Sequence, residues 1–354
     1  MNILFIIPDY SGTGGAETVI NTVCIELKKR DINYCVYIAA KRKTKNEPTN
    51  LKWLENIKYS RENFNLKIKK LNEFFHSLKI NKIIRNENID KIITVDGKGI
   101  SLARKAIGKN NKDIMLFSWA HITIQKVKGN KLFKQADHHI TISEKISEQI
   151  EKLGINRKDI TTVYNPVYPQ STTIAFNPKN FLFMGRLRES HKQVSTIFSA
   201  LSKVSGDWTL HVVGGGPDSE IYKHQAKELG IENKVIFHGF IENPWGYIKN
   251  NIGSVGSLLL SSRIEGFPMV LCEAMSYGIY CISSDCETGP NEIIVEKNNG
   301  QLFDVGDDKT LSFHIQNIID GKISIDQNKI KDSIAHLYTE NYMRKLIKAL
   351  TSKK

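Results

Sequence analysis

Two kinds of hydrophobic pattern alternate along the whole chain. Short runs of apolar, often β-branched residues predict buried strands, and segments whose apolar residues recur every three or four positions predict amphipathic helices. One helical face of this kind carries Ala16, Val19, Ile20, Val23 and Leu27. The runs that predict strands lie at 2–7, 34–40, 91–95, 114–119, 138–142, 180–185, 209–214, 234–239, 257–262 and 280–284.

The order of these elements predicts an α/β fold. Apolar strands separated by helices indicate parallel sheets covered on both faces. Half of the strands precede the proline-rich segment 165–178, which has the composition of a linker, and half follow it. We therefore expect two doubly wound domains, over residues 1–168 and 176–328. The remainder, 329–354, is expected to form a helix near 329–350 that could cross back to the first domain.

Polar and glycine-rich segments follow many of the predicted strands. Ligands of open parallel sheets bind beyond the carboxyl ends of the strands, so these segments are candidate binding positions. They lie at 9–17, 96–97, 121, 185–192, 214–218, 239–241, 265–273 and 285–292. Their composition fits a polar ligand held between two domains.

The segment SGTGGAET follows the first strand and opens the first helix. Its glycines, Gly12, Gly14 and Gly15, lack the G-x-G-x-x-G spacing of a dinucleotide-binding loop. The loop can bring backbone N–H groups close to an anion at the helix N-terminus. A simple tight turn is the alternative, in which Glu17 merely complements the helix dipole.

Two basic residues lie just past the first strand of the second half, in FLFMGRLRESHKQ. A guanidinium (Arg186) and an ammonium (Lys192) at this place can bind a diphosphate and stabilise the charge that builds as it departs. The alternative is a pair of solvated surface charges.

The segment EGFPMVLCEAMSYG places two carboxylates in a stretch that otherwise has core composition. Pro268 suits the first turn of a helix, and Gly278 suits its C-terminal cap. The N–H groups of Met269 and Val270 would then be among the free donors at the helix N-terminus, where phosphate binds.

Glu273 falls about one turn along this helix, roughly 6 Å by the helix rise. It could accept hydrogen bonds from a ribose beside the phosphate, while Glu265 on the preceding loop could reach a sugar on the other side. Gly266 allows the backbone to approach closely. An exposed face residue is the alternative for Glu273, although its neighbours have the composition of a core.

Taken together, these motifs resemble those of a retaining glycosyltransferase of family 4. The spacing of Glu265 and Glu273, with Gly-Phe after the first, is that family's most specific signature, and the similarity covers nearly the whole chain. Within the family, the sequence is most similar to the galactosyltransferases that build the lipopolysaccharide core. The segments that carry this similarity are FSWAH, VYNPV, ENPW, SSRIEGFPMVLCEAMSYG and SSDCETGP. Pro268 and Tyr280 depart from the family, which commonly has glycine and proline there.

The resemblance implies the GT-B fold, in which two Rossmann-like, doubly wound parallel-sheet domains face a central cleft. The first domain would bind the acceptor and the second the nucleotide sugar. Glu273 would bind the ribose, Glu265 the transferred sugar, and Arg186 with Lys192 the diphosphate. The residues implied for catalysis are His121, Glu265, Arg186 and Lys192. Those implied for donor binding are Gly14, Gly15, Arg186, Lys192, Gly214, Phe240, Ile241, Glu265, Gly266, Phe267, Met269, Val270 and Glu273.

His121, in SWAH, would by this resemblance lie near the sugar and the acceptor. An ordinary loop histidine is the alternative. The resemblance implies no required metal, so we expect no metal cofactor. The Asp285-Cys286-Glu287 triplet, without a histidine, is poor evidence for magnesium.

The excess of positive charge lies in the first half of the chain. The whole sequence has a formal net charge of +13, and residues 171–354 are neutral overall. Such a field attracts anionic lipid, nucleic acid or an acidic substrate. Segment 66–85 sets Leu71, Phe74, Phe75 and Leu78 beside Lys67, Lys69, Lys70, Lys79 and Lys82. This is the pattern of a basic amphipathic helix in a headgroup layer, or of a packed helix with a solvated lysine face.

Other features restrict the class of protein to which the chain can belong. No apolar run approaches the roughly 18 residues of a membrane span, and the N-terminus has the pattern of a strand instead of a signal peptide. Five cysteines without a C-x-x-C pair indicate a reduced cytosolic protein, and no His/Cys cluster has zinc spacing. We expect a cytoplasmic enzyme, peripheral on the inner face of the membrane.

The expected reaction moves a hexose from a UDP donor to a hydroxyl of lipopolysaccharide core or a similar glycolipid. The resemblance implies that this hexose is galactose. An anionic membrane surface is the second expected partner, and nucleic acid is not one. A nucleotide-sugar epimerase on the same fold is an alternative, but it needs neither an acceptor nor a basic face. A degenerate module that only binds UDP-sugar is another, although the complete set of charged residues argues against it.

Overall fold

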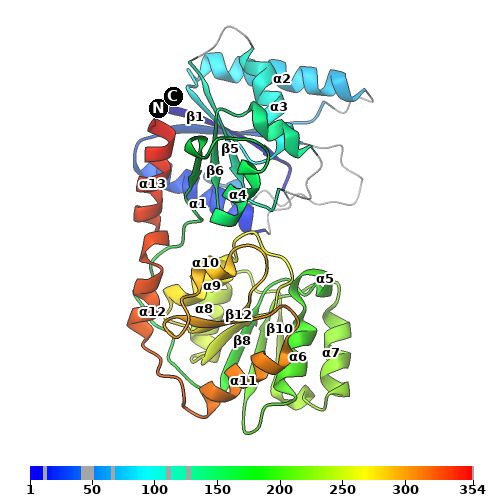
Figure 1. The fold of residues 1–354 in the computed structure, drawn as a ribbon. Helices are drawn as coiled ribbons and strands as arrows, with labels where there is room; N and C mark the ends of the chain where they lie inside the picture. The colour runs from blue at the N-terminus through cyan, green and yellow to red at the C-terminus, as the bar shows by residue number, and fades with distance from the viewer. Residues whose placement is uncertain (11–13, 41–51, 65–67, 109–112, 125–128, 353–354) are drawn as a thin grey trace. The chain divides into compact units, whose positions relative to one another are not determined.

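The computed structural model describes residues 1–10, 14–40, 52–64, 68–108, 113–124 and 129–352. The chain divides into two compact units (Figure 1). Unit 1 comprises Met1–Pro166 with Thr339–Lys354, and unit 2 comprises Val167–Tyr338. Gly12 and Lys67, both considered above, lie outside the described residues.

Unit 1 is built on a seven-stranded sheet in the order β3-β2-β1-β4-β5-β6-β7, and its strand pairs are parallel. Its strands are β1 (Asn2–Pro8), β2 (Asn33–Ala39), β3 (Tyr59–Glu62), β4 (Lys91–Thr94), β5 (Met115–Ala120), β6 (His138–Thr141) and β7 (Ile160–Thr162). Its helices are α1 (Gly15–Lys29), α2 (Lys69–Asn86), α3 (Gly97–Ile107), α4 (Glu144–Glu151) and α13 (Thr339–Thr351). Short 3₁₀ turns occupy Lys52–Leu54, Asn130–Gln135 and Arg157–Asp159.

Unit 2 is built on a six-stranded sheet in the order β10-β9-β8-β11-β12-β13, again with parallel pairs. Its strands are β8 (Asn180–Met184), β9 (Thr209–Val213), β10 (Val235–Gly239), β11 (Ser257–Leu260), β12 (Cys281–Ser284) and β13 (Gly300–Phe303). Its helices are α5 (Glu189–Lys192), α6 (Val194–Leu201), α7 (Ser219–Glu228), α8 (Pro244–Tyr247), α9 (Met269–Ser276), α10 (Pro290–Ile293), α11 (Asp308–Ile319) and α12 (Gln327–Ser333). The turns Glu232–Lys234 and Ala335–Leu337 are 3₁₀, and Ile248–Ile252 is a π turn.

Both sheets reverse the direction in which strands are added, at β1/β4 and at β8/β11. Because parallel crossovers are right-handed, helices before and after a reversal cover opposite faces. In unit 2, α6 and α7 accordingly lie on one side of the sheet, and α8, α9 and α10 lie on the other (Figure 1).

All ten runs predicted to be strands form strands, and the predicted face of α1 packs into the core through Val19, Ile20, Val23 and Leu27. The structure adds β3, β7 and β13, which the hydrophobic pattern did not predict. All three lie at an edge of their sheet and have three or four residues. An edge strand has one neighbour and needs no continuous apolar run.

The single helix expected near 329–350 is wrong, because the chain forms α12 and α13 with a 3₁₀ turn between them. Ile330 and Leu337 are buried in unit 2, and Tyr338 is extended (ψ 142°), so the helix ends before the chain passes into unit 1. The units therefore divide at 166/167 and 338/339 and not at the expected 168 and 329. These two crossings are adjacent, since the Val167 N–H donates to the Leu337 carbonyl (3.0 Å).

Within unit 1, α13 packs beside α1, where Arg30 forms an ion pair with Glu340. All five cysteines of the chain are free and buried. Among the described residues, no helix combines the length and the apolar character that crossing a membrane requires.

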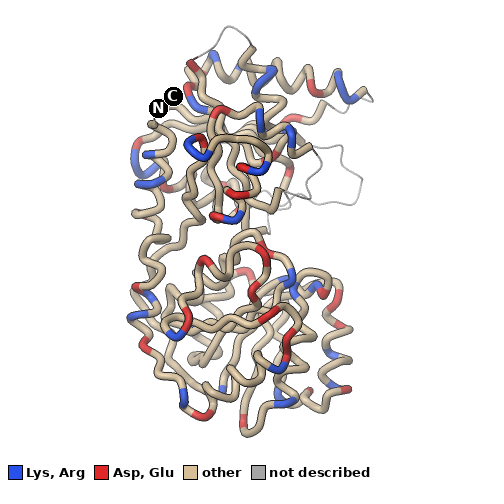
Figure 2. The backbone as a smooth tube through the Cα atoms, in the orientation of Figure 1, with Lys and Arg blue, Asp and Glu red and all other residues tan. Residues whose placement is uncertain are grey.

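Helix α2 exposes an apolar surface, which we call the α2 face and define as Ile68, Leu71, Phe74, Phe75 and Leu78. These side chains are between 41% and 59% exposed. A different side of the helix is buried in the domain, through His76, Ser77, Ile80 and Ile84. Lysines and an arginine are distributed along the same helix (Figure 2). The predicted apolar stripe is therefore not what holds α2 to its domain.

Candidate active site

The candidate site of unit 2 lies at the neighbouring strands β8 and β11, where the order of the strands in the sheet reverses. The loop after β8 contains Arg186 and leads into α5 with Lys192, and the loop after β11 contains Glu265. Since the carboxyl ends of neighbouring parallel strands meet at one edge, these loops lie at the point where such sheets bind ligands.

Backbone contacts fix the two loops to each other. The Ser261 hydroxyl donates to the carbonyls of Lys192 (2.9 Å) and Gln193 (2.8 Å), and the Arg263 N–H donates to the His191 carbonyl (2.8 Å). Gln193 has a left-handed backbone (φ 42°), which is uncommon outside glycine. The hydrogen bonds from Ser261 hold this turn and with it the position of Lys192.

Lys192 and Glu265 form an ion pair, with 2.5 Å between Nζ and Oε1. Both side chains are half-buried. The residues that the sequence assigned to the diphosphate and the transferred sugar are thus in direct contact. The Thr288 hydroxyl also donates to the Glu265 carbonyl, which ties the loop after β12 to the same place.

Helix α9 starts at this loop. Pro268 is its N-cap residue, one position before the helical turn in which the sequence analysis placed it. Among the described residues, the N–H groups of Met269 and Val270 have no hydrogen-bond partner, so they are free donors at the helix N-terminus. The helix ends as predicted at Gly278 (φ 78°), whose N–H donates to the Met275 carbonyl (2.9 Å).

Glu273 lies one turn into α9 and is half-buried among buried neighbours, so the alternative of an exposed face residue is wrong. Burial raises the pKa of the Glu273 carboxyl, and a hydrogen bond from Trp245 opposes that rise. The indole Nε1 of Trp245 donates to Oε2 of Glu273 at 2.9 Å. The Trp245 ring stacks on Tyr277, with 5.1 Å between ring centroids.

Three glycines after β9 bring backbone loops together. A side chain at Gly214 (φ 139°) would place its Cβ 1.9 Å from the Gly185 carbonyl oxygen, and one at Gly216 would place it 2.1 Å from that of Leu187. The Leu187 N–H donates to the Gly215 carbonyl (3.0 Å). Only glycine permits this contact between the loops after β8 and β9.

A cavity of about 370 Å³ lies beside these loops. It is lined by Leu187, Gly214, Gly215, Ser219, Lys223, Phe237, His238 and Gly239. The two predicted residues that follow differ in exposure, since Phe240 is 73% exposed and Ile241 is half-buried. A cavity at the carboxyl ends of β8 to β10 can receive part of a ligand whose phosphates lie at β8 and β11.

Three hydrogen-bonded side chains, those of His211, His238 and Tyr247, lie next to this cavity, and the sequence analysis did not select them. His238 contacts His211 (Nε2 to Nδ1, 3.0 Å) and the Tyr247 hydroxyl (3.1 Å). Burial lowers the pKa of both histidines, that of His211 to about 4. The chain links β9 and β10 to the short helix α8, which also carries Trp245.

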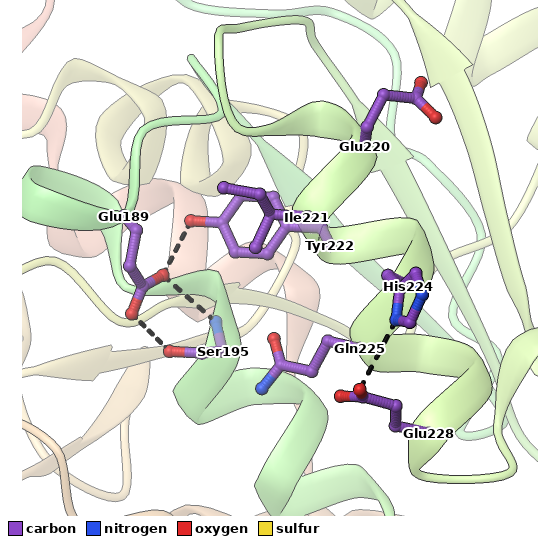
Figure 3. A pocket seen from close by; sticks show the side chains of 8 residues that line it. All are labelled: Glu189, Ser195, Glu220, Ile221, Tyr222, His224, Gln225 and Glu228. Atoms are coloured by element: carbon purple, nitrogen blue, oxygen red, sulfur yellow. Dashed lines mark hydrogen bonds and ion pairs between the residues drawn. The ribbon is translucent and has the colours of Figure 1, made fainter.

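A larger cavity of about 630 Å³ lies between α5, α6 and α7 (Figure 3). Glu189 faces Ser195 and Tyr222, and its carboxylate accepts from the Tyr222 hydroxyl at 2.7 Å. The Glu189 N–H donates to the Asp218 carboxylate (2.7 Å). These contacts fix the start of α5, the helix that ends with Lys192. Glu189, the residue of this cavity with the most hydrogen bonds named here, therefore has a structural role.

Arg186, by contrast, is exposed. In the part of the chain that the structure describes, its side chain has no ion pair or hydrogen bond. It is therefore available to an anion, but the protein does not fix its position as it fixes Lys192. Gly266, Phe267, Met269 and Val270 lie on the loop and first turn between Glu265 and Glu273.

The remaining predicted residues belong to unit 1. Gly14 is the N-cap of α1 and Gly15 its first residue. His121 follows β5, is 8% exposed, and packs against Trp119 with 4.4 Å between ring centroids. Burial lowers the pKa of His121 to about 3, so its ring is neutral at physiological pH. Its Nε2 is buried and finds no hydrogen-bond partner among the described residues.

No group of three or more His, Cys, Asp or Glu side chains among the described residues is arranged to hold a metal ion. Asp285 is largely exposed. Partial desolvation of its carboxyl, followed by the negative charge of nearby Asp304, raises its pKa. The sequence analysis did not select Trp245 as a site residue. The only signal for it in the sequence was the ENPW segment.

Comparisons with known proteins give consistent results. The family model described as Glycosyl transferases group 1 matches residues 165–336, and that described as Glycosyltransferase Family 4 matches residues 13–171. A lipopolysaccharide 1,6-galactosyltransferase of Salmonella typhimurium is 36% identical, over 100% of this chain and 99% of the relative. That of Escherichia coli K12 is 33% identical, over 99% and 98%. The solved apo structure of the lipopolysaccharide outer core galactosyltransferase WaaB is 35% identical, with a TM-score of 0.91 and 100% coverage of both chains.

Proposed function

Because the chain belongs to glycosyltransferase family 4, we propose that it transfers galactose from UDP-galactose to a hydroxyl of lipopolysaccharide core or a similar glycolipid. Membership confirms the predicted enzyme class, a glycosyltransferase with the GT-B fold. None of the matches reported above supports the epimerase alternative. The choice of sugar and acceptor rests on the names of the Salmonella typhimurium and Escherichia coli relatives.

The single observation that carries the proposal is the arrangement at the β8/β11 reversal. Lys192, at the end of α5, pairs with Glu265 on the loop after β11. The free N–H groups of Met269 and Val270, and then Glu273, follow Glu265 along that loop and into α9. A diphosphate fits the ammonium and the helix N-terminus, since both favour negative charge. A ribose attached to that diphosphate would then find an acceptor in Glu273, and the sugar would find Glu265.

In the proposed reaction, the bond between the anomeric carbon and the diphosphate oxygen breaks as the acceptor oxygen bonds to the same carbon. Negative charge grows on the leaving diphosphate, where Lys192, Arg186 and the N-terminus of α9 stabilise it. The acceptor proton passes to a diphosphate oxygen, and UDP leaves. We identify no carboxylate as a nucleophile, because Glu265 is paired with Lys192, so attack on the face that the leaving group vacates would retain the anomeric configuration.

Glu265 has a second role in this scheme. Its carboxylate holds Lys192 beside the helix N-terminus and can also accept hydrogen bonds from hydroxyls of the transferred sugar. His121 is proposed to act near the sugar and acceptor as a neutral ring, since burial keeps it unprotonated. Gly14 and Gly15 would contribute backbone N–H groups to the donor.

Incubation with UDP-galactose, with and without a truncated core glycolipid, tests the proposal. Product that contains galactose only when the acceptor is present supports it. A new free or nucleotide-bound sugar without acceptor would indicate an epimerase, and UDP-galactose binding without turnover would indicate a degenerate binding module. A panel of UDP-hexoses in the same assay then tests the preference for galactose.

The proposed enzyme needs no metal cofactor, because the side chains and helix N-terminus described above meet the diphosphate charge. Activity should therefore persist in EDTA. Complete loss in EDTA, with recovery on adding Mn²⁺ or Mg²⁺, would overturn this part of the proposal and point to Asp285 and Glu287 as ligands.

The second proposed partner is the anionic inner face of the cytoplasmic membrane, on which the protein would be peripheral. The α2 face is exposed next to exposed Lys69, Lys70 and Lys82, the combination with which helices bind headgroup layers. The Lys79 side chain is instead paired with Glu62 (2.8 Å). Such binding would bring a soluble donor and a membrane-bound acceptor to one enzyme, and no nucleic acid is involved.

A further inference from the structure

Helix α8 holds one residue against the side chain proposed to bind ribose. We propose that Trp245 is a positioning residue, whose indole N–H fixes the Glu273 carboxylate in the orientation that accepts the ribose hydroxyls of the donor. This inference rests on the proposed function, because it assumes that Glu273 meets a ribose. Trp245 itself acts through Glu273 and touches no reacting atom.

The hydrogen bond between the two residues leaves Glu273 free to bind a ligand. The indole uses Oε2 (2.9 Å), while Oε1 has no hydrogen-bond partner among the described residues. An ionised carboxylate offers about four acceptor positions, so one indole donor leaves capacity for two hydroxyls. Without the Trp245 indole, the half-buried Glu273 carboxylate would lose its only hydrogen-bond donor among the described residues and would rotate more freely.

The Trp245 ring is itself held by α9. Glu273 and Tyr277 are four residues apart, so they lie on one face of the helix, one turn from each other. Trp245 spans both of them, because its ring stacks on Tyr277 at an interplanar angle of 24° while its N–H reaches Glu273. This double contact defines where the donor N–H points.

The short helix that carries Trp245 is anchored at both ends. Asn243 caps it, accepting from the Gly246 N–H at 3.1 Å, and Pro244 fixes its first turn. Tyr247 contacts His238, which contacts His211 on β9. The strands that border the 370 Å³ cavity are thereby linked to the orientation of Glu273.

A purely structural role of Trp245 would stabilise α8 without affecting ribose recognition, and the following test separates the two. Trp245→Phe keeps an aromatic ring and removes the N–H. UDP and 2′,3′-dideoxy-UDP, which lacks both ribose hydroxyls, are titrated against the full chain. We expect about tenfold weaker UDP binding, the range of one charge-assisted hydrogen bond, and unchanged binding of the dideoxy analogue. In a Glu273→Ala background, Trp245→Phe should have no further effect.

Trp208→Phe is the matched control. It removes another indole N–H of unit 2, which donates to the Val204 carbonyl (3.4 Å) far along the chain from α9, and it should leave both affinities unchanged. If Trp245→Phe does not fold, benzothienylalanine at position 245 keeps the shape of the ring and replaces only the N–H.

Equal loss of affinity for both nucleotides, or no loss for either, would overturn the positioning role. A different result identifies failure of the proposed function itself. If Glu273→Ala binds UDP as tightly as the parent, Glu273 does not meet the ribose, whatever Trp245 does.

Discussion

The two sheets reverse direction in the same way, but the charged groups at the two reversals differ. At β8/β11, Lys192 and Arg186 join the free N-terminus of α9. At β1/β4, the described side chains are acidic, with Asp9 after β1 and Asp96 after β4. We therefore propose an anion site at the reversal of unit 2, and none among the described side chains at the reversal of unit 1.

The acidic groups of unit 1 are already engaged. Asp9 accepts two hydrogen bonds from Arg61 (2.9 and 2.6 Å), and Asp96 caps α3 by accepting from the Gly99 N–H (2.6 Å). Burial, followed by the negative charges of Asp96 and Glu17, raises the pKa of Tyr10 beside them. This environment disfavours a diphosphate, so unit 1 is expected to contribute backbone N–H groups at Gly14 and Gly15 instead of charge.

The difference between the two reversals bears on the role of the net charge of +13. The excess lies in the first half of the chain, yet the first reversal is acidic, so the excess is not there to bind the donor. Part of it lies on α2, next to an exposed apolar face. The charges proposed to bind the donor and those proposed to bind a membrane are thus in different units, and variants can separate the two roles.

The largest effect is expected from Lys192→Ala. It removes the fixed cation at the leaving group, so kcat should fall about 10²–10³-fold while UDP affinity changes less. Lys105→Ala is the matched control, because Lys105 forms an ion pair of the same length with Glu73 (2.5 Å) in unit 1. A folded Lys192→Ala variant with normal kcat would remove this residue from the mechanism. Arg186→Ala should act in the same direction with a smaller effect, because Arg186 is not fixed.

Glu273→Ala comes next. It deletes the acceptor of the ribose hydroxyls, and each charged hydrogen bond contributes about 1.5–3 kcal/mol, so the Kd for UDP should rise at least about tenfold. Calorimetric titration measures this, with Glu228→Ala as the control from the exposed side of α7. An unchanged Kd would show that the ribose is bound elsewhere.

Replacing Lys67, Lys69 and Lys70 by Gln should weaken binding to anionic liposomes about tenfold at physiological salt. Each lysine near such a surface contributes roughly 1 kcal/mol without screening, so three would give on the order of a hundredfold, and salt reduces this effect. UDP affinity should not change. Gln at Lys227, Lys249 and Lys309 makes the same charge change on exposed positions of unit 2 and should leave liposome binding intact. Equal cosedimentation of the two triple variants, or equal binding to neutral and anionic vesicles, would refute the role of α2.

The smallest effect concerns pH. Burial raises the pKa of Glu273, so its carboxylate takes up a proton at a higher pH than an ordinary glutamate does. A protonated carboxyl accepts fewer hydrogen bonds, and UDP affinity should therefore fall a few-fold (~3) as pH is lowered from neutrality. UDP titrates too, so the measurement is the difference between the parent and Glu273→Gln profiles. Parallel profiles would contradict the prediction.

Interior strands were predictable from sequence because they are apolar on both faces, as Ile3 to Ile7 of β1 are. The edge strand β3, with the sequence YSRE, has no such pattern and depends on pairing with β2. The break between α12 and α13 was missed for a similar reason. It lies where the chain passes between units, which helical periodicity does not encode.

The candidate site shows the same division. The positions of Lys192 and Glu265 after strands were predictable, but their ion pair depends on β8 and β11 being neighbours, which strand order alone determines. Trp245 lies 28 positions from Glu273, and only the fold brings the indole to the carboxylate. Arg186 was predicted together with Lys192, and the structure distinguishes the exposed side chain from the held one.

Hydrogen exchange of the full chain with and without UDP tests the contrast between the two reversals most directly. We expect the strongest slowing of exchange in 185–193 and 265–273 of unit 2, and little change in 96–99 of unit 1. Slowing concentrated in 96–99, with the amides of Met269 and Val270 exchanging as they do without UDP, would contradict it.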